Sequence, residues 1–207
     1  MTMLRWFARA TVAAVALVML SPLLLAIACA IYLDDPGPVF FRQARVGRHG
    51  RVFRIWKFRS MRVVPGPLLT VGGDPRITRV GRVLRRCKLD ELPQLLNVLD
   101  GTMTFVGPRP EVLRYVDLYT PAQQQVLDLM PGITDPASLA YFEEERVLAV
   151  AADPEKLYVD RILPEKIDIN LHYARRASLF GDVVIVARSI YRMFGIQRLH
   201  LRRLQGG

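Results

Sequence analysis

The sequence predicts an α+β fold: a small, mostly helical domain with one short β-hairpin, preceded by an N-terminal membrane element. Three observations predict it. Residues 10–33 form an uncharged apolar run, residues 38–57 hold aromatic and β-branched residues on both sides of a turn, and later segments show helical spacing interrupted by prolines. The 207 residues, 51% hydrophobic and 23% charged, are enough for about one domain and exclude a disordered chain.

The N-terminal run is long enough for a membrane helix. Its residues 10–33 would extend about 36 Å as a helix, which exceeds the roughly 30 Å of a hydrocarbon core. A secretory signal peptide, with Ala28-Cys29-Ala30 as its cleavage site, would have a shorter apolar region of ~7–15 residues. We therefore expect residues 1–33 to be retained as a membrane element and residues 34–207 to form the domain.

Ser21 and Pro22 lie in the middle of this run. Because Pro22 lacks an amide hydrogen and clashes with the preceding turn, we expect a break or kink, with the Ser21 hydroxyl bonding a freed carbonyl. Arg5 and Arg9 before the run, and the basic stretch after it, both favour a cytoplasmic location. A re-entrant helix-break-helix satisfies both ends. The alternative, a spanning helix with a mild kink, satisfies one.

The charge is concentrated directly after the membrane element. Basic residues outnumber acidic residues by 29 to 19, giving a net charge of +10. Residues 34–114 hold 16 basic and 7 acidic residues, whereas residues 115–207 hold 11 and 12. Nucleic acid, a lipid surface and a phosphorylated substrate are all suitable partners for such a charge.

The remaining elements follow from local patterns. The hairpin carries a basic residue at every third position from Arg42 to Lys57, a spacing that distributes charge over both faces. Residues 79–88 and 93–99 have helical spacing, and residues 111–130 read as a helix that is open to interruption at Pro121. Prolines and glycines mark loops at residues 108–110, 131–132 and 135–136.

The C-terminal segment is predicted to be an amphipathic helix. Its apolar residues 183–194 are followed by Arg198, Arg202 and Arg203. Such a helix suits a membrane interface, with its apolar face toward the lipid. A core helix with a solvated basic end fits the pattern equally well.

An acidic pair, Asp90-Glu91, lies within the basic segment. In a purely structural interpretation, Asp90 is a helix N-cap, Glu91 favours the positive helix end and Pro93 suits the first turn. In a chemical interpretation, neighbouring cations keep a carboxylate ionised, so that it can attack phosphorus or hold a divalent metal. Farther on, Pro108 and Pro110 hold Arg109 on a stiff turn suited to bidentate phosphate contacts.

Several motifs together resemble the bacterial sugar transferase family, the monotopic polyprenyl-phosphate phosphoglycosyl transferases, in their minimal catalytic form. The residues that carry the resemblance are Gly37–Gln43, Lys57-Phe-Arg-Ser-Met61, Asp74-Pro-Arg-Ile-Thr-Arg-Val-Gly81, Leu89-Asp-Glu-Leu-Pro-Gln-Leu-Leu-Asn-Val-Leu99 and Gly107-Pro-Arg-Pro110. The Ser21-Pro22 pair resembles the break in the family's re-entrant membrane helix.

The resemblance implies a reaction and a set of roles. The enzyme would transfer a sugar 1-phosphate from a nucleoside diphosphate sugar, usually a UDP-sugar, to undecaprenyl phosphate on the cytoplasmic face of the bacterial inner membrane. Asp90 would attack the β-phosphate to give a phosphosugar-aspartyl intermediate and release UMP, and Glu91, with Asp90, would hold Mg²⁺. Arg85 and Arg109 match phosphate-binding arginines, and Lys57 and Arg59 are further candidates.

One residue departs from the family pattern, and one alternative function stays open. Thr102 stands where the family usually has an acidic residue, and the role of that carboxylate is therefore in doubt. The rival is a non-enzymatic, membrane-tethered basic module that binds anionic lipid or nucleic acid through residues 42–62, whereas the family resemblance implies membrane lipid and no nucleic acid. The sequence identifies neither the sugar nor the glycan pathway, and it leaves the oligomeric state open, a homodimer included.

Overall fold

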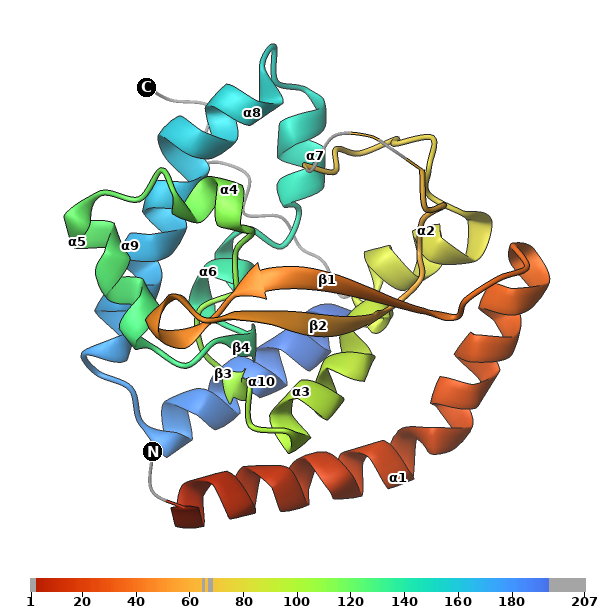
Figure 1. Cartoon of the computed structure of the whole chain (residues 1–207), viewed down its shortest axis with the longest axis horizontal. Coiled ribbons are helices and arrows are strands. Elements are labelled where there is room, and N and C mark those ends of the chain that lie inside the picture. The colour runs from red at the N-terminus through yellow and green to blue at the C-terminus, as the bar shows by residue number, and fades with distance from the viewer. Residues whose placement is uncertain (1–2, 65, 67–68, 194–207) are drawn as a thin grey trace.

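The computed structural model describes residues 3–64, 66 and 69–193 and has the predicted α+β class (Figure 1). Its strands form two small sheets, an antiparallel pair β1–β2 and a parallel pair β3–β4. The strands are β1 (Phe40–Val46), β2 (Val52–Phe58), β3 (Thr104–Val106) and β4 (Gly132–Thr134). The α-helices are α1 (Met3–Asp34), α2 (Arg79–Arg86), α3 (Leu95–Leu99), α4 (Leu113–Val116), α5 (Pro121–Gln124), α6 (Pro136–Ala140), α7 (Glu144–Ala149), α8 (Pro154–Leu157), α9 (Leu163–Ala174) and α10 (Leu179–Met193). Shorter helical turns are η1 (Arg48–Gly50), η2 (Leu89–Gln94), η3 (Gln125–Asp128) and η4 (Tyr158–Ile162).

The predicted hairpin is confirmed. Its strands pair from Phe40 opposite Phe58 to Val46 opposite Val52. Its basic residues divide between the two faces: Arg42 is exposed, whereas only 15% of the Lys57 side chain is exposed. Some of this positive charge therefore points into the domain rather than into solvent.

Helix α1 continues through Pro22 instead of breaking there. Figure 1 shows that it is bent into two arms. The amide that Pro22 lacks would have bonded the Val18 carbonyl, and the Ser21 hydroxyl donates to that oxygen at 2.7 Å. The predicted repair by Ser21 is confirmed, but the predicted helix-break-helix is wrong: because the freed carbonyl has a new donor, the helix bends without interruption.

Both arms of α1 pack against the domain. In the first arm, Ala13 is fully buried and packs with Leu95, Val98 and Met103; in the second, Ile27 and Ile31 pack with Phe58 and Leu84. The opposite side of the helix exposes large apolar residues (Met3, Leu4, Phe7, Val12, Val15, Val18, Met19, Leu23, Leu25, Tyr32 and Leu33). Within the described ranges, α1 is the one helix long and apolar enough to cross a membrane.

Two carboxylates fix the end of α1 to the domain. Asp34 accepts a hydrogen bond from the Val80 amide at 2.9 Å, in the first turn of α2. Asp35 pairs with Arg59, just after β2, at 3.0 Å. The direction in which α1 leaves the domain is therefore set by contacts to two separate elements.

The segment 111–130 differs from the single helix predicted for it. It forms two short helices, α4 and α5, and a final helical turn, η3. Thr120 has an extended backbone and caps α5 through a reciprocal pair of hydrogen bonds with Gln123, so the expected interruption at Pro121 is confirmed. These helices pack with α7 and α9 around a core that includes Tyr115, Leu148 and Ile162.

The loop predicted at residues 131–132 is partly wrong, because Gly132 begins strand β4. A Cβ atom on Gly132 would lie 2.2 Å from the Gly107 amide nitrogen, closer than atoms can pack. Glycines at both positions allow the two backbones to approach and β3 and β4 to pair. The turn that carries Arg109 therefore begins directly beside β4.

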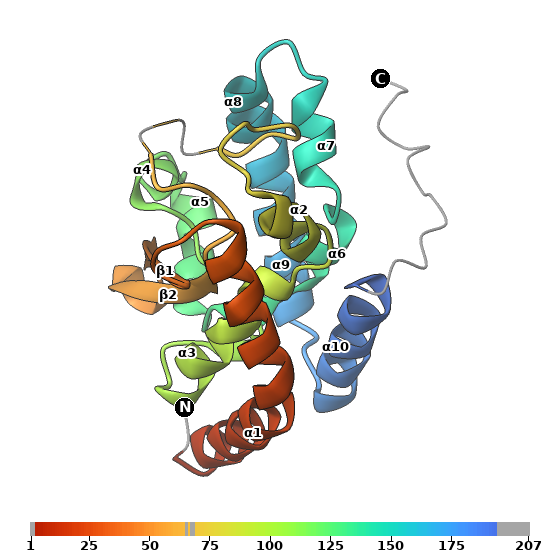
Figure 2. The ribbon, with the colours of Figure 1, turned by 90° about the vertical axis from the view of Figure 1, so that its right-hand side faces the viewer.

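Helix α10 lies on the opposite face of the domain from the hairpin (Figure 2). Ile185 is buried, while Leu179, Phe180, Val183, Ile190 and Tyr191 are exposed. The predicted C-terminal helix is confirmed: one side packs on the domain and the other exposes apolar residues among the described part of the chain, while its setting at a membrane interface stays a prediction. Arg198, Arg202 and Arg203 lie outside the described residues.

Candidate active site

A cavity of about 410 Å³ collects most of the residues singled out from the sequence. It lies between α1, the 89–95 segment, the 133–145 segment and α10. The predicted site residues that line it are Lys57, Arg85, Asp90, Glu91 and Arg109. These predicted residues come from three separate stretches of the chain, 57, 85–91 and 109, and meet around one space.

Asp90 and Glu91 belong to the first turn of η2, and Asp90 is not the predicted N-cap. The residue at the cap position is Lys88, whose backbone is left-handed at φ 52°. This sharp turn carries the chain from α2 into η2 and buries both carboxylates, leaving Asp90 3% exposed. Among the described atoms, Asp90 Oδ1 has no hydrogen-bond donor.

Glu91 is held by two cations. Both terminal nitrogens of Arg109 donate to it: Nη1 to Oε2 at 2.8 Å and Nη2 to Oε1. Lys57 Nζ donates to Oε1 at 3.3 Å. The turn Pro108–Pro110 and the end of β2 are thereby tied to the same carboxylate.

Asn97 places β2 beside η2. Its buried side-chain amide accepts a hydrogen bond from the Trp56 amide at 2.9 Å and donates to the Arg54 carbonyl at 3.0 Å. These are the bonds that a neighbouring strand would make, so one side chain replaces a strand at this edge. Lys57 follows Trp56 directly and so reaches Glu91.

The charges in the site have opposite effects on the two carboxyls. Burial, with the adjacent Glu91, raises the pKa of Asp90 despite the attraction of Lys57 and Arg85. Burial also opposes ionisation of Glu91, but Arg109 and Lys57 outweigh it and hold the pKa of Glu91 well below its usual range. The predicted lowering by neighbouring cations therefore prevails for Glu91, whereas for Asp90 burial and the adjacent Glu91 outweigh it.

Burial also acts on Lys57, because it lowers the pKa of this ammonium group to about 8. Glu91 opposes that effect and Arg109 adds to it. The charge of Lys57 therefore depends on pH close to the neutral range.

Arg85 lines the cavity but is already engaged. Its Nη2 bonds Glu145 Oε1 at 2.5 Å. Glu144, next to it, accepts from Lys166 at 2.7 Å, and all three partners also line the cavity. No local sequence pattern predicts Glu144, Glu145 or Lys166 as site residues, because the fold brings α7 and α9 to the site from 50 residues or more beyond Asp90.

The structure places Arg59 apart from the other predicted site residues. It is 7% exposed, does not line the cavity, and binds the Asp35 carboxylate and carbonyl at the end of α1. Lys57 lies within β2 and lines the cavity. The strand ends at Phe58, so its alternation of side chains does not extend to Arg59. In this structure Arg59 therefore anchors the end of α1.

Thr102 also lies outside the cavity. Its hydroxyl donates to Asp100 Oδ1 at 2.6 Å, and it accepts from the Asn97 amide at 3.2 Å. These bonds close the turn between α3 and β3. The departure at Thr102 is accommodated within this turn and does not touch the carboxylate pair.

The carboxylate pair is a minimal donor set for a metal. The described residues contain no group of three or more His, Cys, Asp or Glu placed to hold one. Mg²⁺ in phosphate chemistry usually takes one or two carboxylates, with water and substrate phosphates as its other ligands. The buried, unpartnered oxygen of Asp90 beside Glu91 fits that requirement.

Comparison with known proteins gives a consistent result. The family model described as bacterial sugar transferase matches residues 2–195. The chain is 41% identical over 190 residues to a UDP-glucose:undecaprenyl-phosphate glucose-1-phosphate transferase of Xanthomonas campestris pv. campestris, covering 88% of this chain and 37% of the relative. It is 40% identical over 184 residues to a UDP-N-acetylgalactosamine-undecaprenyl-phosphate N-acetylgalactosaminephosphotransferase of Aeromonas hydrophila, covering 86% and 40%.

A third relative is closer in length. The exopolysaccharide production protein ExoY of Sinorhizobium fredii is 32% identical over 197 residues, covering 86% of this chain and 80% of the relative. The chain thus spans about two fifths of the first two relatives and four fifths of this one. Because the family model matches nearly the whole sequence, the chain belongs to the bacterial sugar transferase family.

Proposed function

We propose that this protein transfers a sugar 1-phosphate from a UDP-sugar to undecaprenyl phosphate. The names of the relatives supply the donor and acceptor classes. The observation that carries the proposal is the Asp90 carboxylate, which lines a cavity together with Arg85, Arg109 and Lys57 and whose buried Oδ1 has no hydrogen bond among the described atoms. An unbonded carboxylate oxygen is a better nucleophile than a bonded one, and the cations would stabilise charge on phosphoryl oxygens.

The reaction has two displacements at the same phosphorus. An Asp90 oxygen forms a bond to the β-phosphorus of the donor, and the bond from that phosphorus to the bridging oxygen breaks, so UMP leaves with its electron pair. A phosphate oxygen of undecaprenyl phosphate then attacks, and the Asp90 carboxylate leaves. The products are UMP and a lipid diphosphate sugar.

The residues around the cavity have different roles in the proposed reaction. Arg109 and Lys57 fix Glu91 beside the nucleophile, and their outward-facing charge would bind donor phosphates. Arg85 would join them by exchanging Glu145 for phosphate. Bound Mg²⁺, held by Asp90 and Glu91 together with the donor, would neutralise phosphate charge.

The acceptor lipid would enter along the apolar side of the cavity. Ala16 and Leu20 of α1 face that space, and Val186, Ile190 and Met193 of α10 line it too. An isoprenoid chain needs such a wall, whereas a free nucleotide does not. The burial of Lys57 and the pairing of Arg109 also favour an enzyme over a basic module, because a polymer could not reach these cations.

We propose that α1 enters the membrane and returns, and that the domain lies on the cytoplasmic face of the inner membrane. The bend at Pro22 and the packing of both arms on the same domain support a re-entrant path. The basic residues on both sides of the apolar run support the cytoplasmic face. Reporter fusions at each end of α1 test this, since a periplasmic N-terminus would refute it.

The reaction is tested by UMP release from a panel of UDP-sugars with undecaprenyl phosphate and Mg²⁺. We expect release with a specific sugar and none from Asp90→Asn. Without acceptor, mass spectrometry of the wild type should find the peptide containing Asp90 heavier by one sugar phosphate. Equal release from wild type and Asp90→Asn would refute Asp90 as the nucleophile.

A further inference from the structure

A second, partly buried carboxylate, Glu111, lies two residues beyond Arg109 and lines a different cavity from Asp90. Glu111 has a side chain 13% exposed and accepts three hydrogen bonds. The donors are Arg45 Nη1 at 3.0 Å, the Tyr158 hydroxyl at 2.5 Å and the Val112 amide at 2.8 Å. They come from β1, from η4 and from the turn itself, so one carboxylate joins three parts of the fold.

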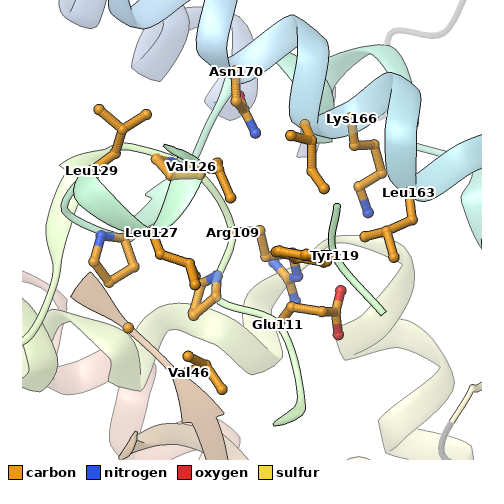
Figure 3. Close-up of a pocket in the computed structure, with 15 residues that line it drawn as sticks. Val46, Arg109, Glu111, Tyr119, Val126, Leu127, Leu129, Leu163, Lys166 and Asn170 are labelled. Carbon is orange, nitrogen blue, oxygen red and sulfur yellow. The ribbon is translucent and has the colours of Figure 1, made fainter. Parts of the chain in front are cut away.

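Glu111 faces a different space from the carboxylate pair. It lines a separate cavity of about 40 Å³, which is large enough for water but not for a nucleotide. Figure 3 shows Glu111 and Arg109 side by side at this pocket, with Tyr119 next to them. Arg109 lines both cavities, whereas Glu111 lines only the small one. Glu111 is therefore placed to act on Arg109 and not on a donor in the large cavity.

The backbone on both sides of Arg109 is fixed by the same network. The Pro110 carbonyl accepts from Arg45 Nη1 at 3.3 Å, and the Glu111 carbonyl accepts from the Val46 amide at 2.8 Å. On the other side, the Pro108 carbonyl accepts from the Gly132 amide at 3.1 Å. The Arg109 side chain therefore projects from a turn anchored to β1 and to β4.

The negative charge of Glu111 also acts on the two arginines beside it, Arg45 and Arg109. Arg45 is buried close behind Arg109: burial lowers the pKa of Arg45, and the charge of Arg109 lowers it further, while Glu111 opposes both. Without the Glu111 carboxylate, two partly buried guanidinium groups would repel each other across the turn. Neutralising Arg45 allows Arg109 to stay in place with its own charge directed at Glu91.

We infer that Glu111 is a positioning residue: with Arg45 and Tyr158 it holds the Pro108–Pro110 turn so that Arg109 meets Glu91 and the donor phosphates. The inference rests on the proposed function for its kinetic consequence. It has a second consequence that needs no activity, since the Arg109–Glu91 pair should weaken when Glu111 is changed.

The first test uses Glu111→Gln and Tyr158→Phe, with Tyr173→Phe as matched control. Tyr173 also donates to a carboxylate, Asp182, at 2.8 Å, but it does not line the large cavity. We expect Glu111→Gln to lower kcat/KM for the UDP-sugar by about 10- to 100-fold, because misplacement of a substrate-positioning group by ~1 Å costs about that much. Tyr158→Phe should act in the same direction and Tyr173→Phe should stay within twofold.

The second test separates positioning from general damage. In an Arg109→Lys background, Glu111→Gln should lower kcat/KM by less than twofold, because the group it positions is already altered. An equal loss in both backgrounds, or no loss in the wild type, would overturn the inference.

The third test is independent of turnover. Arg109→Met should lower the melting temperature of the wild type more than that of Glu111→Gln, and equal losses would count against the inference. If wild-type protein released no UMP, the proposed function would fail, and this comparison of melting temperatures would still decide whether Glu111 holds Arg109.

Discussion

Replacing the proposed nucleophile should stabilise the protein while abolishing its activity. Asp90 is 3% exposed, one of its oxygens has no donor, and burial raises its pKa. A buried group without its hydrogen bond costs about 1–3 kcal/mol, and the nearby Lys57 and Arg85 offset part of this cost. We therefore expect Asp90→Asn to raise the free energy of unfolding by about 1–2 kcal/mol at pH 7, or the melting temperature by about 2–8 °C.

The stability difference between Asp90→Asn and the wild type should depend on pH in a defined direction. A carboxyl whose pKa is higher in the folded state than in the unfolded state stabilises the fold at low pH, and that stability is lost as the pH rises past its unfolded value. The advantage of Asp90→Asn should therefore be present at pH 7 and shrink toward pH 4. Thermal unfolding in detergent, followed by circular dichroism at both pH values, measures it, and UMP release should fall by at least about a thousandfold.

Asp135→Asn is the matched control. Asp135 is equally buried at 1% exposed, but the Ser138 amide and hydroxyl donate to its two oxygens at 2.9 and 2.5 Å. The same substitution should therefore give no gain in stability. A lower melting temperature for Asp90→Asn at pH 7, or an equal rise at both pH values, would refute the reasoning.

Three further predictions concern the neighbours of Asp90. Arg109→Met leaves the buried Glu91 carboxylate with Lys57 alone and should lower the unfolding free energy by about 3 kcal/mol; in a Glu91→Gln background the loss should be below about 1 kcal/mol, as measured by denaturant unfolding. Because the pKa of Lys57 is about 8, kcat/KM should fall as the pH rises through that value, and Lys57→Arg should move the fall to higher pH; an unchanged profile would contradict this assignment. Thr102→Ala removes hydrogen bonds of the α3–β3 turn and should cost about 1 kcal/mol while leaving UMP release within twofold, so a large loss of activity would show that Thr102 acts in the site.

Local patterns predicted what local physics decides. The hairpin follows from its aromatic and β-branched residues around a glycine-bounded turn, and the Ser21 hydrogen bond follows from the donor that Pro22 lacks. The family motifs predicted Asp90, Glu91 and Arg109 as site residues, and these three residues line one cavity. In these cases the residues that determine the structure are neighbours in sequence or belong to a family motif.

Errors occurred where distant contacts decide. Asp90 is of a residue type that is typical of a helix N-cap, but the left-handed backbone of Lys88 directs the Asp90 side chain into the interior. Arg59 is two residues from Lys57, yet the end of β2 directs it to Asp35 instead of the cavity. Glu111 follows the Arg109 turn in sequence, but its importance depends on Tyr158, 47 residues away, for which no local pattern exists.

The packing of α1 links the membrane to the architecture of the proposed active site. Two of the described core clusters contain residues of α1, and one of them includes Leu89 and Leu92 on either side of the carboxylate pair. Deleting residues 1–33 would therefore not free a soluble enzyme from a tether, but would open the interior on which Asp90 and Glu91 rest. A change in bilayer thickness that alters the bend of α1 would act on the same packing, so the lipid composition around this protein becomes a variable of its chemistry.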